Sequence, residues 1–369
     1  MRPGVSAQGG EHTVAVQLGA RSYTIHVGAG ILETLGARMH ALGLGKRAAI
    51  VTNPSVERLY GERVRASLER SGFSPVTIEI PDGEEHKNLA WVAFIYDRLI
   101  EARLERGSVM VALGGGVVGD VTGFAAATYL RGIDFVQVPT TLVAQIDSSI
   151  GGKTGVDIAA GKNLIGAFHH PRLVIADTTT LRTLPPRELR AGLAEIIKTG
   201  AILSPELIDF LERNHRQVLD LDDAAVRFVV DSCAQLKALV VAEDETEGDY
   251  RAILNFGHTL GHAIESLTGY KTFLHGEAVA LGMVFALKLS VRLGLLDQAV
   301  ADRVVALLTL YGLPTEVPSD LSTSALAVAV EADKKRSQGR VKFVCLEDIG
   351  RTKFRMLSTQ ELQEALDAL

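Results

Sequence analysis

In the first half of the chain, short runs of apolar and β-branched residues alternate with longer stretches in which apolar residues recur at helical spacing. Residues 12–18 and 22–28 are predicted to form a hairpin around Gly19. Further strands are expected at residues 47–53, 75–80, 108–113 and 133–141, with helices at 54–72 and 89–107 between them. Regular alternation of strands and helices predicts a parallel sheet covered by helices on both faces.

After about residue 185 the hydrophobic pattern has mainly the period of helices. Helical stretches cover residues 185–203, 224–245, 255–269 and 275–294, and only 340–350 and 352–357 have the pattern of strands. The predicted fold is an α/β N-terminal domain, residues 1–184 with 1–10 as a frayed tail, followed by a mainly α-helical C-terminal domain, residues 185–369. The cleft between two such domains is the usual place for a ligand.

Composition and charge narrow the function classes. The 369 residues are 47% hydrophobic and 22% charged, with a net charge of −6. An acidic balance argues against a nucleic-acid partner, but it is compatible with a locally positive cleft for an anionic substrate. The most apolar stretch, 276–296, carries three charged residues, so we expect a core helix rather than a membrane span. The N-terminus lacks the apolar region of a secretion signal, and we expect a cytoplasmic protein.

Two glycine-rich motifs suggest nucleotide chemistry. Gly114, Gly116 and Gly119 in "LGGGVVGD" satisfy GxGxxG directly after a predicted strand, which favours a pyrophosphate at a helix N-terminus. The motif alone is weak evidence, and it does not follow the first strand, as a standard dinucleotide fold requires. "SIGGKTG" is no phosphate-binding P-loop, because Asp147 occupies the position of its first glycine.

Two histidines, His258 and His262, lie four residues apart in "GHTLGHAIE", with Glu265 three residues further on. This spacing places all three side chains on one helical face. The pattern is half of HExxH, but Thr259 stands where the catalytic glutamate would be, so a zincin peptidase is excluded.

Further candidates for metal or acid–base chemistry lie on either side of this motif. His275 precedes an apolar helix, and Glu195 lies in an apolar helical stretch with Lys198 three residues later. One carboxylate with histidines and no cysteine suits zinc in a catalytic site with an open position. Spacing does not determine which histidines bind metal and which transfer protons. The two cysteines, Cys233 and Cys345, stand in no metal-binding spacing and are expected to be buried thiols.

Taken in order, the motifs resemble those of the 3-dehydroquinate synthase family, over some 330 residues. The segments that carry the resemblance are "SYTIHVGAG", "DGEEHKN", "GGGVVGDVTGFAAATYLRGI", "VPTTLVAQIDSSIGGKTGVD", "GKNLIGAF", "LPPRELRAGLAEIIKTG", "LNFGHTLGHAIE", "LHGEAVALGM" and "ADKKRSQGRVKFV". The resemblance implies a Rossmann-like NAD-binding domain and the superfold shared with iron-containing alcohol dehydrogenases. It also implies the second step of the shikimate pathway, conversion of 3-deoxy-D-arabino-heptulosonate 7-phosphate (DAHP) to 3-dehydroquinate and phosphate. NAD, one divalent metal ion (zinc or cobalt) and a homodimer are expected, with neither a nucleic-acid nor a membrane partner.

Matching motif positions imply roles for individual residues. The implied metal ligands are Glu195, His258 and His275, with His262 as a nearby acid–base or phosphate-contacting residue. The implied NAD contacts are Asp82, Glu84, Lys87, Gly114, Gly115, Gly116, Val117, Val118, Gly119, Asp120, Thr140, Thr141, Lys153, Lys162, Thr180 and Thr183. The implied substrate contacts are Asp147, Lys153, Asn163, Lys198, Lys237, Arg251, Asn255 and one or more of Lys334 and Lys335. Arg131 resembles the arginine that reaches a phosphate across the dimer interface.

The implied reaction is redox-neutral overall. A metal ion favours the alkoxide of the substrate, and hydride passes to NAD. The new ketone acidifies the neighbouring C–H, and phosphate leaves by elimination. NADH then returns its hydride, the ring opens, and an intramolecular aldol reaction closes the carbocycle. No side chain is assigned to the elimination proton, because the leaving phosphate itself can accept it.

Three alternative functions deserve comparison with this one. Another sugar-phosphate cyclase would alter pocket residues, whereas "LNFGHTLGHA" with Asn255 and His262 is intact. A metal-dependent polyol dehydrogenase would release NADH and would not need the lysines and arginines that bind a phosphate and a carboxylate. A catalytically inactive NAD-binding scaffold is disfavoured because every expected ligand is present.

Overall fold

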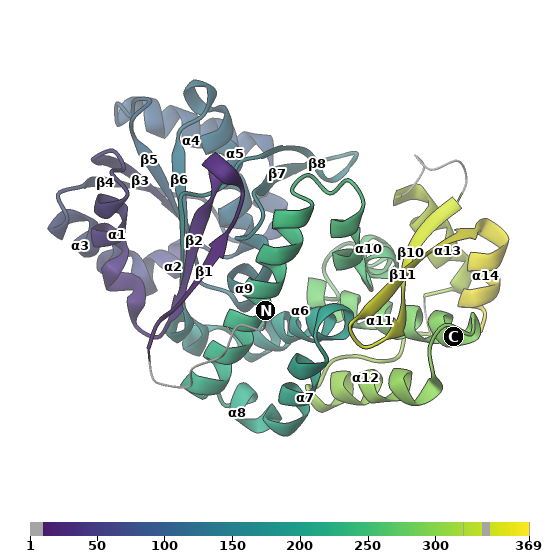
Figure 1. Cartoon of the computed structure of the whole chain (residues 1–369). Helices are drawn as coiled ribbons and strands as arrows, with labels where there is room; N and C mark the ends of the chain where they lie inside the picture. Colours follow the sequence, from purple (N-terminus) through teal and green to yellow (C-terminus); the bar gives the residue numbers. More distant parts are fainter. Residues whose placement is uncertain (1–9, 320, 334–339, 369) are drawn as a thin grey trace. The chain divides into compact units, whose positions relative to one another are not determined.

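The structure is a computed structural model that describes residues 10–319, 321–333 and 340–368. The described chain divides into two compact units (Figure 1). The first contains the described residues up to Thr183 together with Leu221–Thr246, and the second contains Leu184–Asp220 and the described residues from Glu247 onward.

A seven-stranded sheet is the centre of the first unit. Its strands are β1 (His12–Val16), β2 (Tyr23–Gly28), β3 (Arg47–Thr52), β4 (Ser74–Glu79), β5 (Val109–Gly114), β6 (Asp134–Pro139) and β9 (Leu173–Asp177), in the spatial order β1-β2-β9-β6-β5-β3-β4. All neighbours are parallel except β1 and β2. The central strands are covered on both faces, which explains why their sequences are continuous apolar runs rather than alternating ones.

Helices cover both faces of this sheet, as the strand–helix alternation predicts. They are α1 (Leu35–Ala41), α2 (Pro54–Val56), α3 (Glu62–Arg70), α4 (Leu89–Glu101), α5 (Gly116–Thr128) and α9 (Asp223–Glu243). One apolar core contains residues of α4 and α5, and a separate core contains residues of α1 and α3. Asn88 begins α4 by accepting hydrogen bonds from the amides of Ala90 and Trp91, as expected of an N-cap.

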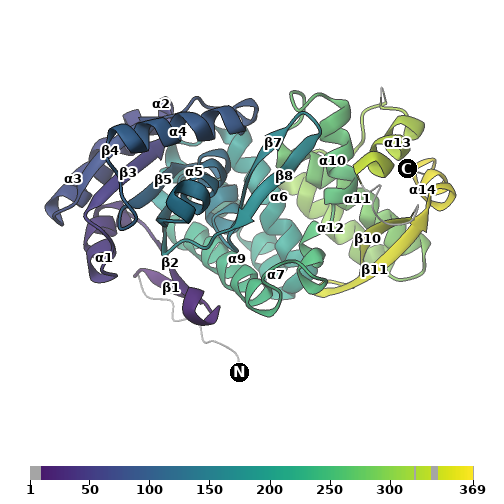
Figure 2. The ribbon, with the colours of Figure 1, turned by 90° about the horizontal axis from the view of Figure 1, so that it is seen from above.

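A second hairpin, β7 (Lys153–Ile158) and β8 (Gly161–Phe168), lies alongside α5 in the first unit (Figure 2). The sequence pattern did not predict this hairpin or β9. Gly155 and Gly166 face each other in the ladder, where a Cβ at Gly166 would lie 2.3 Å from the Thr154 carbonyl oxygen. The hairpin carries Lys153, Lys162 and Asn163, three of the predicted site residues.

The second unit is mainly helical, with one two-stranded ribbon. Its elements are α6 (Pro186–Leu203), α7 (Pro205–Arg213), α8 (His215–Leu219), α10 (His258–Leu267), α11 (His275–Arg292), α12 (Gln298–Leu310), α13 (Thr323–Asp333), β10 (Arg340–Asp348), β11 (Arg351–Ser358) and α14 (Thr359–Leu366). Helix α11 is buried over most of its length, with Lys288 and Arg292 exposed, as expected of a core helix. Among the described residues, no helix combines the length and apolarity needed to cross a membrane.

The segment Leu221–Thr246 differs from the expected division of the chain. The first unit reaches Thr183, next to the expected boundary at residue 184, but α9 also belongs to it. Helix α9 packs on β1, on β2 and on the turn Ala144–Ser148. Its apolar side chains, such as Val229 and Val230, are buried there, so packing assigns this helix to a unit that is distant in sequence.

Candidate active site

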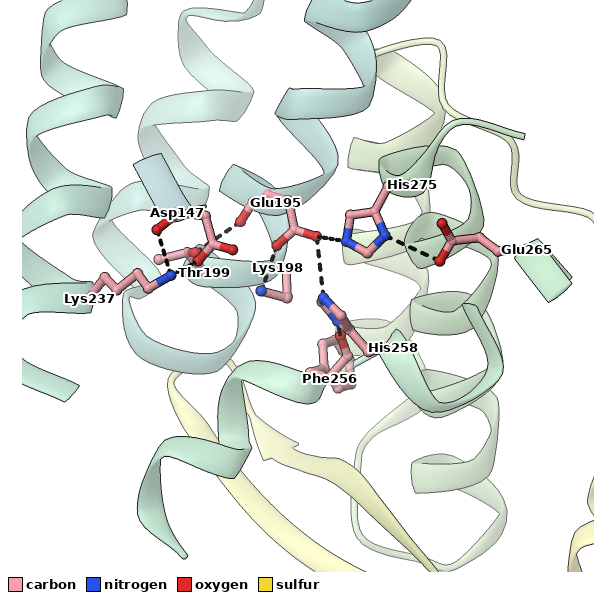
Figure 3. Close-up of polar contacts among 9 residues, drawn as sticks. All are labelled: Asp147, Glu195, Lys198, Thr199, Lys237, Phe256, His258, Glu265 and His275. Atoms are coloured by element: carbon pink, nitrogen blue, oxygen red, sulfur yellow. Dashed lines mark hydrogen bonds and ion pairs between the residues drawn. The ribbon is translucent and has the colours of Figure 1, made fainter. Parts of the chain in front are cut away.

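Three helices of the second unit bring Glu195, His258 and His275 together (Figure 3). Glu195 lies in the middle of α6, His258 is the first residue of α10, and His275 is the first residue of α11. Oε1 of Glu195 lies 3.6 Å from Nε2 of His258 and 3.5 Å from Nε2 of His275. Glu195 is 1% exposed, and its Oε1 accepts no hydrogen bond from the described residues.

Both imidazole rings are oriented by a second contact on Nδ1. Nδ1 of His258 lies 3.2 Å from the carbonyl oxygen of Phe256, and Nδ1 of His275 lies 3.3 Å from Oε2 of Glu265. When Nδ1 carries the proton, each Nε2 presents its lone pair toward Glu195. This arrangement is typical of histidines that bind metal.

The distances from Oε1 of Glu195 to the two histidine nitrogens fit a shared metal ion, and all three atoms lie within 4.8 Å of one another. Separations of 3.5 and 3.6 Å are too long for good hydrogen bonds. Two ligand atoms bound at about 2.1 Å to one tetrahedral ion lie about 3.4 Å apart. The geometry therefore suits zinc or a similar divalent cation, as the donor types already suggested.

The charges around Glu195 keep it ionised. Burial opposes ionisation, but Lys198, whose Nζ lies 2.5 Å from Oε2, and the two imidazoles outweigh it and hold the pKa of Glu195 well below its usual range. Burial and the positive charge of Lys198 lower the pKa of His258 to about 3, so this ring is neutral and can act as a ligand. Burial also opposes protonation of His275, but its contacts with Glu195 and Glu265 raise its pKa to about 10.

His262 lies beside this cluster without facing Glu195. Its ring centroid is 5.5 Å from that of His258 and 6.1 Å from that of His275, and its side chain is exposed. It belongs to a second possible donor set with Glu265 and His275. Arg251 and Asn255 precede α10 in the same unit. Arg251 is 2% exposed, and Asn255 Nδ2 donates to Oε1 of Glu247 at 3.1 Å.

The glycine turn of the first unit lies at the topological switch point of the sheet. The parallel strands β4-β3-β5-β6-β9 follow the doubly wound order 2-1-3-4-5, in which ligands bind at the carboxyl ends of the first and third strands. Here those strands are β3 and β5, and β5 ends at Gly114, directly before α5. A Cβ at Gly115 would lie 3.0 Å from Thr141, and one at Gly116 would lie 3.1 Å from Ser148, so glycine keeps the helix start open.

Charged residues of α5, of the segment before α4 and of the β7–β8 hairpin form ion pairs in the first unit. Lys87 is 5% exposed, with its Nζ 2.6 Å from Oδ2 of Asp120 and 2.7 Å from Oδ1 of Asn163. Lys162 Nζ lies 3.1 Å from Oε1 of Glu84. Lys87 therefore joins the glycine turn to the β7–β8 hairpin. Burial raises the pKa of Asp120, even though the positive charge of nearby Lys87 acts to lower it.

The predicted threonines follow β6 and β9. Thr141 Oγ1 accepts from the amide of Ala144 at 3.2 Å, and Thr180 Oγ1 accepts from Nε2 of Gln145 at 3.0 Å. Thr183 Oγ1 donates to the carbonyl of Thr180 at 3.0 Å, and Thr140 is 4% exposed at the end of β6.

The other predicted site residues of the first unit are distributed over five segments. Lys237 of α9 contacts the carboxylate of Asp147 and donates to its carbonyl oxygen at 2.7 Å (Figure 3). Lys153 is exposed at the start of β7, Asn163 has a φ of 55°, and Arg131 is exposed with a φ of 71°. Lys334 and Lys335 lie outside the described residues.

Two further residues, one in each unit, contact predicted site residues but were not assigned to the site from the sequence. Asn53 follows β3 at the switch point, and its Nδ2 donates to Oδ1 of Asp82 at 3.2 Å. Its position directly after a buried strand was the available signal. Glu265 was assigned no role, although its i+7 spacing from His258 placed it on the same helical face.

The family follows from comparison with known proteins. Residues 77–191 match the family described as 3-dehydroquinate synthase N-terminal, and residues 192–336 match 3-dehydroquinate synthase C-terminal. The chain belongs to the 3-dehydroquinate synthase family. The 3-dehydroquinate synthase of Pelobacter propionicus is 52% identical over 337 residues, which cover 91% of this chain and 94% of that protein. The resemblance drawn from the motifs is thereby confirmed.

Solved structures confirm the fold class. A 2-deoxy-scyllo-inosose synthase complexed with carbaglucose-6-phosphate, NAD+ and Co2+ matches with a TM-score of 0.86 at 26% identity, over 97% of this chain and 99% of that one. The 2-epi-5-epi-valiolone synthase of Streptomyces hygroscopicus, with NAD+ and Zn2+ bound, matches with a TM-score of 0.85 at 29% identity, over 94% and 96%. Glycerol dehydrogenases at 15–18% identity share the fold alone.

Proposed function

We propose that this chain is a 3-dehydroquinate synthase, a phosphorus–oxygen lyase that converts DAHP to 3-dehydroquinate and phosphate. The observation that carries the proposal is the convergence of Glu195 Oε1 and the Nε2 atoms of His258 and His275, with both rings oriented from behind. Membership of the family supports this reaction above others that such a site could perform.

The cofactors are assigned to separate parts of the chain. A divalent metal on Glu195, His258 and His275 would act as a Lewis acid toward substrate oxygens, and NAD at the glycine turn would accept and return hydride. The open start of α5 offers backbone amides to a pyrophosphate, and buried Lys87 supplies a fixed positive charge close to it.

The proposed reaction also requires cationic side chains, because the substrate carries a phosphate and a carboxylate. Lys153, Lys198, Lys237 and Arg251 are candidates for anion contacts, as is Arg131 from a second subunit of a homodimer. Asn163 and Asn255 can hydrogen-bond hydroxyl groups, and the imidazole of His262 can donate or accept a proton. A cytoplasmic location, like the homodimer, stays a prediction.

Identity supports 3-dehydroquinate synthase over the two other enzyme functions. The chain is 52% identical to a curated 3-dehydroquinate synthase, against 26–29% for the two cyclases named above. A polyol dehydrogenase would produce NADH in proportion to substrate consumed. The proposed reaction returns the hydride within each turnover, so the two activities differ in a measurable product.

The proposal is tested by phosphate release from DAHP. Purified protein receives NAD and Zn2+, with and without a chelator, and phosphate, NADH absorbance and the carbocyclic product are followed together. The expected result is chelator-sensitive release of phosphate without accumulation of NADH, and with 3-dehydroquinate as product. His258→Ala should abolish this activity, while His215→Ala, a histidine outside the cluster in the same unit, should retain it. NADH accumulation or the absence of phosphate release would contradict the proposal.

A further inference from the structure

Glu265 is a buried carboxylate that none of the roles described so far uses. It is 4% exposed on α10, two helical turns after His258. A buried carboxylate is costly unless it is paired or hydrogen-bonded, so the groups that it contacts bear on its role. Oε2 of Glu265 lies 3.3 Å from Nδ1 of His275, on the side of the ring opposite to the nitrogen that faces Glu195 (Figure 3).

This contact makes α10 responsible for two of the three candidate ligands. The helix supplies His258 itself, whose ring is held by the carbonyl of Phe256 just before the helix starts. Through Glu265 it also holds the ring of His275, which belongs to α11. His275 is the more exposed of the two histidines, with 40% of its side chain accessible against 13% for His258. Packing alone therefore restrains the ring of His275 less.

We propose that Glu265 is a positioning residue for the metal site. Its carboxylate accepts the Nδ1–H of His275, fixes the tautomer and rotation of that ring, and keeps Nε2 directed at the ion. The inference rests on the proposed function only in requiring that Glu195, His258 and His275 bind a metal. Partners of this kind typically contribute 10- to 100-fold in metal affinity.

The structure also defines the competing role. Glu265, His262 and His275 form a donor set of their own, with atoms within 4.8 Å of one another. If Glu265 were a ligand there, the chain would bind a second cation, and His275 would serve two ions. Stoichiometry separates the two roles, because positioning leaves one ion per chain.

The test compares three variants of the full-length protein by chelator competition with Zn2+ and by the visible absorption of bound Co2+. Glu265→Ala removes the acceptor and should weaken metal binding by about 10- to 100-fold, with an altered Co2+ spectrum. Glu265→Gln retains an oxygen that can accept from Nδ1–H, so it should lose less affinity and keep the Co2+ spectrum of the unaltered protein. Thermal unfolding of the metal-free proteins shows whether each variant folds.

Glu277→Gln is the matched control for loss of a nearby negative charge. Glu277 lies two residues after His275, but it pairs with Arg187 and accepts from the amide of Leu274 rather than contacting a histidine ring. Its effect on metal affinity should stay within about threefold, because this pair is partly open to solvent and screened.

The outcomes are distinct. The positioning role is supported if only the Glu265 variants lose metal affinity, if Glu265→Ala loses more than Glu265→Gln, and if the protein binds one ion per chain. Equal affinities in Glu265→Ala and Glu277→Gln overturn it, as do two ions in the unaltered protein with one lost in Glu265→Ala. If the unaltered protein binds neither metal, the metal site of the proposed function has failed, and the inference fails with it.

Discussion

Lys198 and Glu195 form an ion pair that is almost completely buried in the second unit. Removing one partner of such a pair leaves an uncompensated buried charge, which is strongly destabilising. Lys198 and the two imidazoles keep Glu195 ionised, and contacts with Glu195 and Glu265 raise the pKa of His275 to about 10 although burial opposes this. A divalent ion held by Glu195, His258 and His275 would replace the proton of His275 and add positive charge to the cluster, which would favour an anionic substrate oxygen.

A pH dependence of stability is expected from His26 in the first unit. Burial, and secondarily Arg38, lower its pKa below the ordinary value of about 6.5, despite the contact with Glu11. The unfolded chain therefore binds a proton at this position more readily than the folded one, so the contribution to stability is lost as pH falls below about 6.5. His26→Gln should reduce the fall in urea midpoint between about pH 7.5 and about pH 5.5.

Fluorescence of Trp91, the only tryptophan, measures this transition in the first unit. The ring of His86 packs against Trp91, with the two centroids 5.9 Å apart, so the unfolding midpoint rather than the fluorescence intensity is compared between the two pH values. His40→Gln, an exposed histidine of α1, is the matched control and should show the full fall. An undiminished fall in His26→Gln would contradict the assignment.

At this scale, the sequence predicted residue types better than roles. Spacing placed His258, His262 and Glu265 on one helical face, but the ligand role depends on what lies behind each ring. The carbonyl of Phe256 orients His258, and no spacing rule reveals that contact. Likewise, Glu195 becomes a candidate ligand because α10 and α11 deliver two nitrogens to it, which requires the tertiary packing of three helices.

Close packing of α11 against two other helices sets the geometry of the cluster. A Cβ on Gly276 would lie 1.8 Å from the carbonyl oxygen of Ala191 in α6, four residues before Glu195. A Cβ on Gly282 would lie 1.8 Å from the carbonyl oxygen of Gly257, directly before His258. Because glycine has no side chain, the backbones approach more closely at these two positions than any other residue would allow. The distances among the three candidate ligands therefore depend on two glycines that are not candidate ligands themselves.

Gly282→Ala should consequently weaken metal binding from a position seven residues away from His275. The added methyl group must displace Gly257, and His258 with it, at a cost of about 1–3 kcal/mol in stability. Because metal sites require ligands placed to within about 0.5 Å, we expect at least a tenfold loss of Zn2+ affinity by chelator competition. Thermal unfolding measures the loss of stability in the same samples.

Gly269→Ala is the control for destabilisation alone. Gly269 follows α10 with a φ of 62°, and a Cβ there would meet no atom within 4 Å. Backbone strain should cost about 1 kcal/mol without moving His258. Unchanged metal affinity in Gly282→Ala would show that α10 can shift without disturbing the cluster.

Secondary elements were predictable where a single period dominates the sequence. Buried parallel strands such as β3 and β5 are continuous apolar runs, and α11 is an apolar helical stretch. The β7–β8 hairpin has neither property, since β8 is mostly exposed and the pair contains close-packed glycines. It forms because its backbone pairs with itself beside α5, a tertiary circumstance that hydrophobic periodicity does not encode.

At the scale of the whole molecule, the sequence predicted an α/β part followed by a helical part, but not the assignment of α9. Its helical character was clear, whereas its partners β1 and β2 lie some two hundred residues away. Lys237 reaches Asp147 only because α9 packs on the turn Ala144–Ser148. One predicted substrate-binding pair thus depends on a packing arrangement that crosses the expected domain boundary.

The predicted homodimer also belongs to the scale of the whole molecule, and Arg131 is the residue predicted to act across its interface. This residue follows α5 in a turn where Leu130 and Arg131 both have positive φ, and both are exposed. Such strained backbone at an exposed arginine is compatible with a role in presenting its side chain outward. The β7–β8 hairpin of the same unit exposes Leu164 and Phe168, apolar surface that a second subunit could cover.

If Arg131 acts in the site of the partner subunit, two inactive variants should restore each other. Arg131→Ala and His258→Ala homodimers should each lose at least about a hundredfold in phosphate release, through loss of an anion contact and of a ligand respectively. In a heterodimer purified through two different tags, one site keeps His258 and receives Arg131 from the other subunit. That dimer should show about half of the wild-type activity, because one of two symmetric sites is intact. Were Arg131 to act within its own chain, both sites would be defective and the heterodimer would remain inactive. Sedimentation of the unaltered protein provides the prior check, since a monomer would remove the basis for complementation.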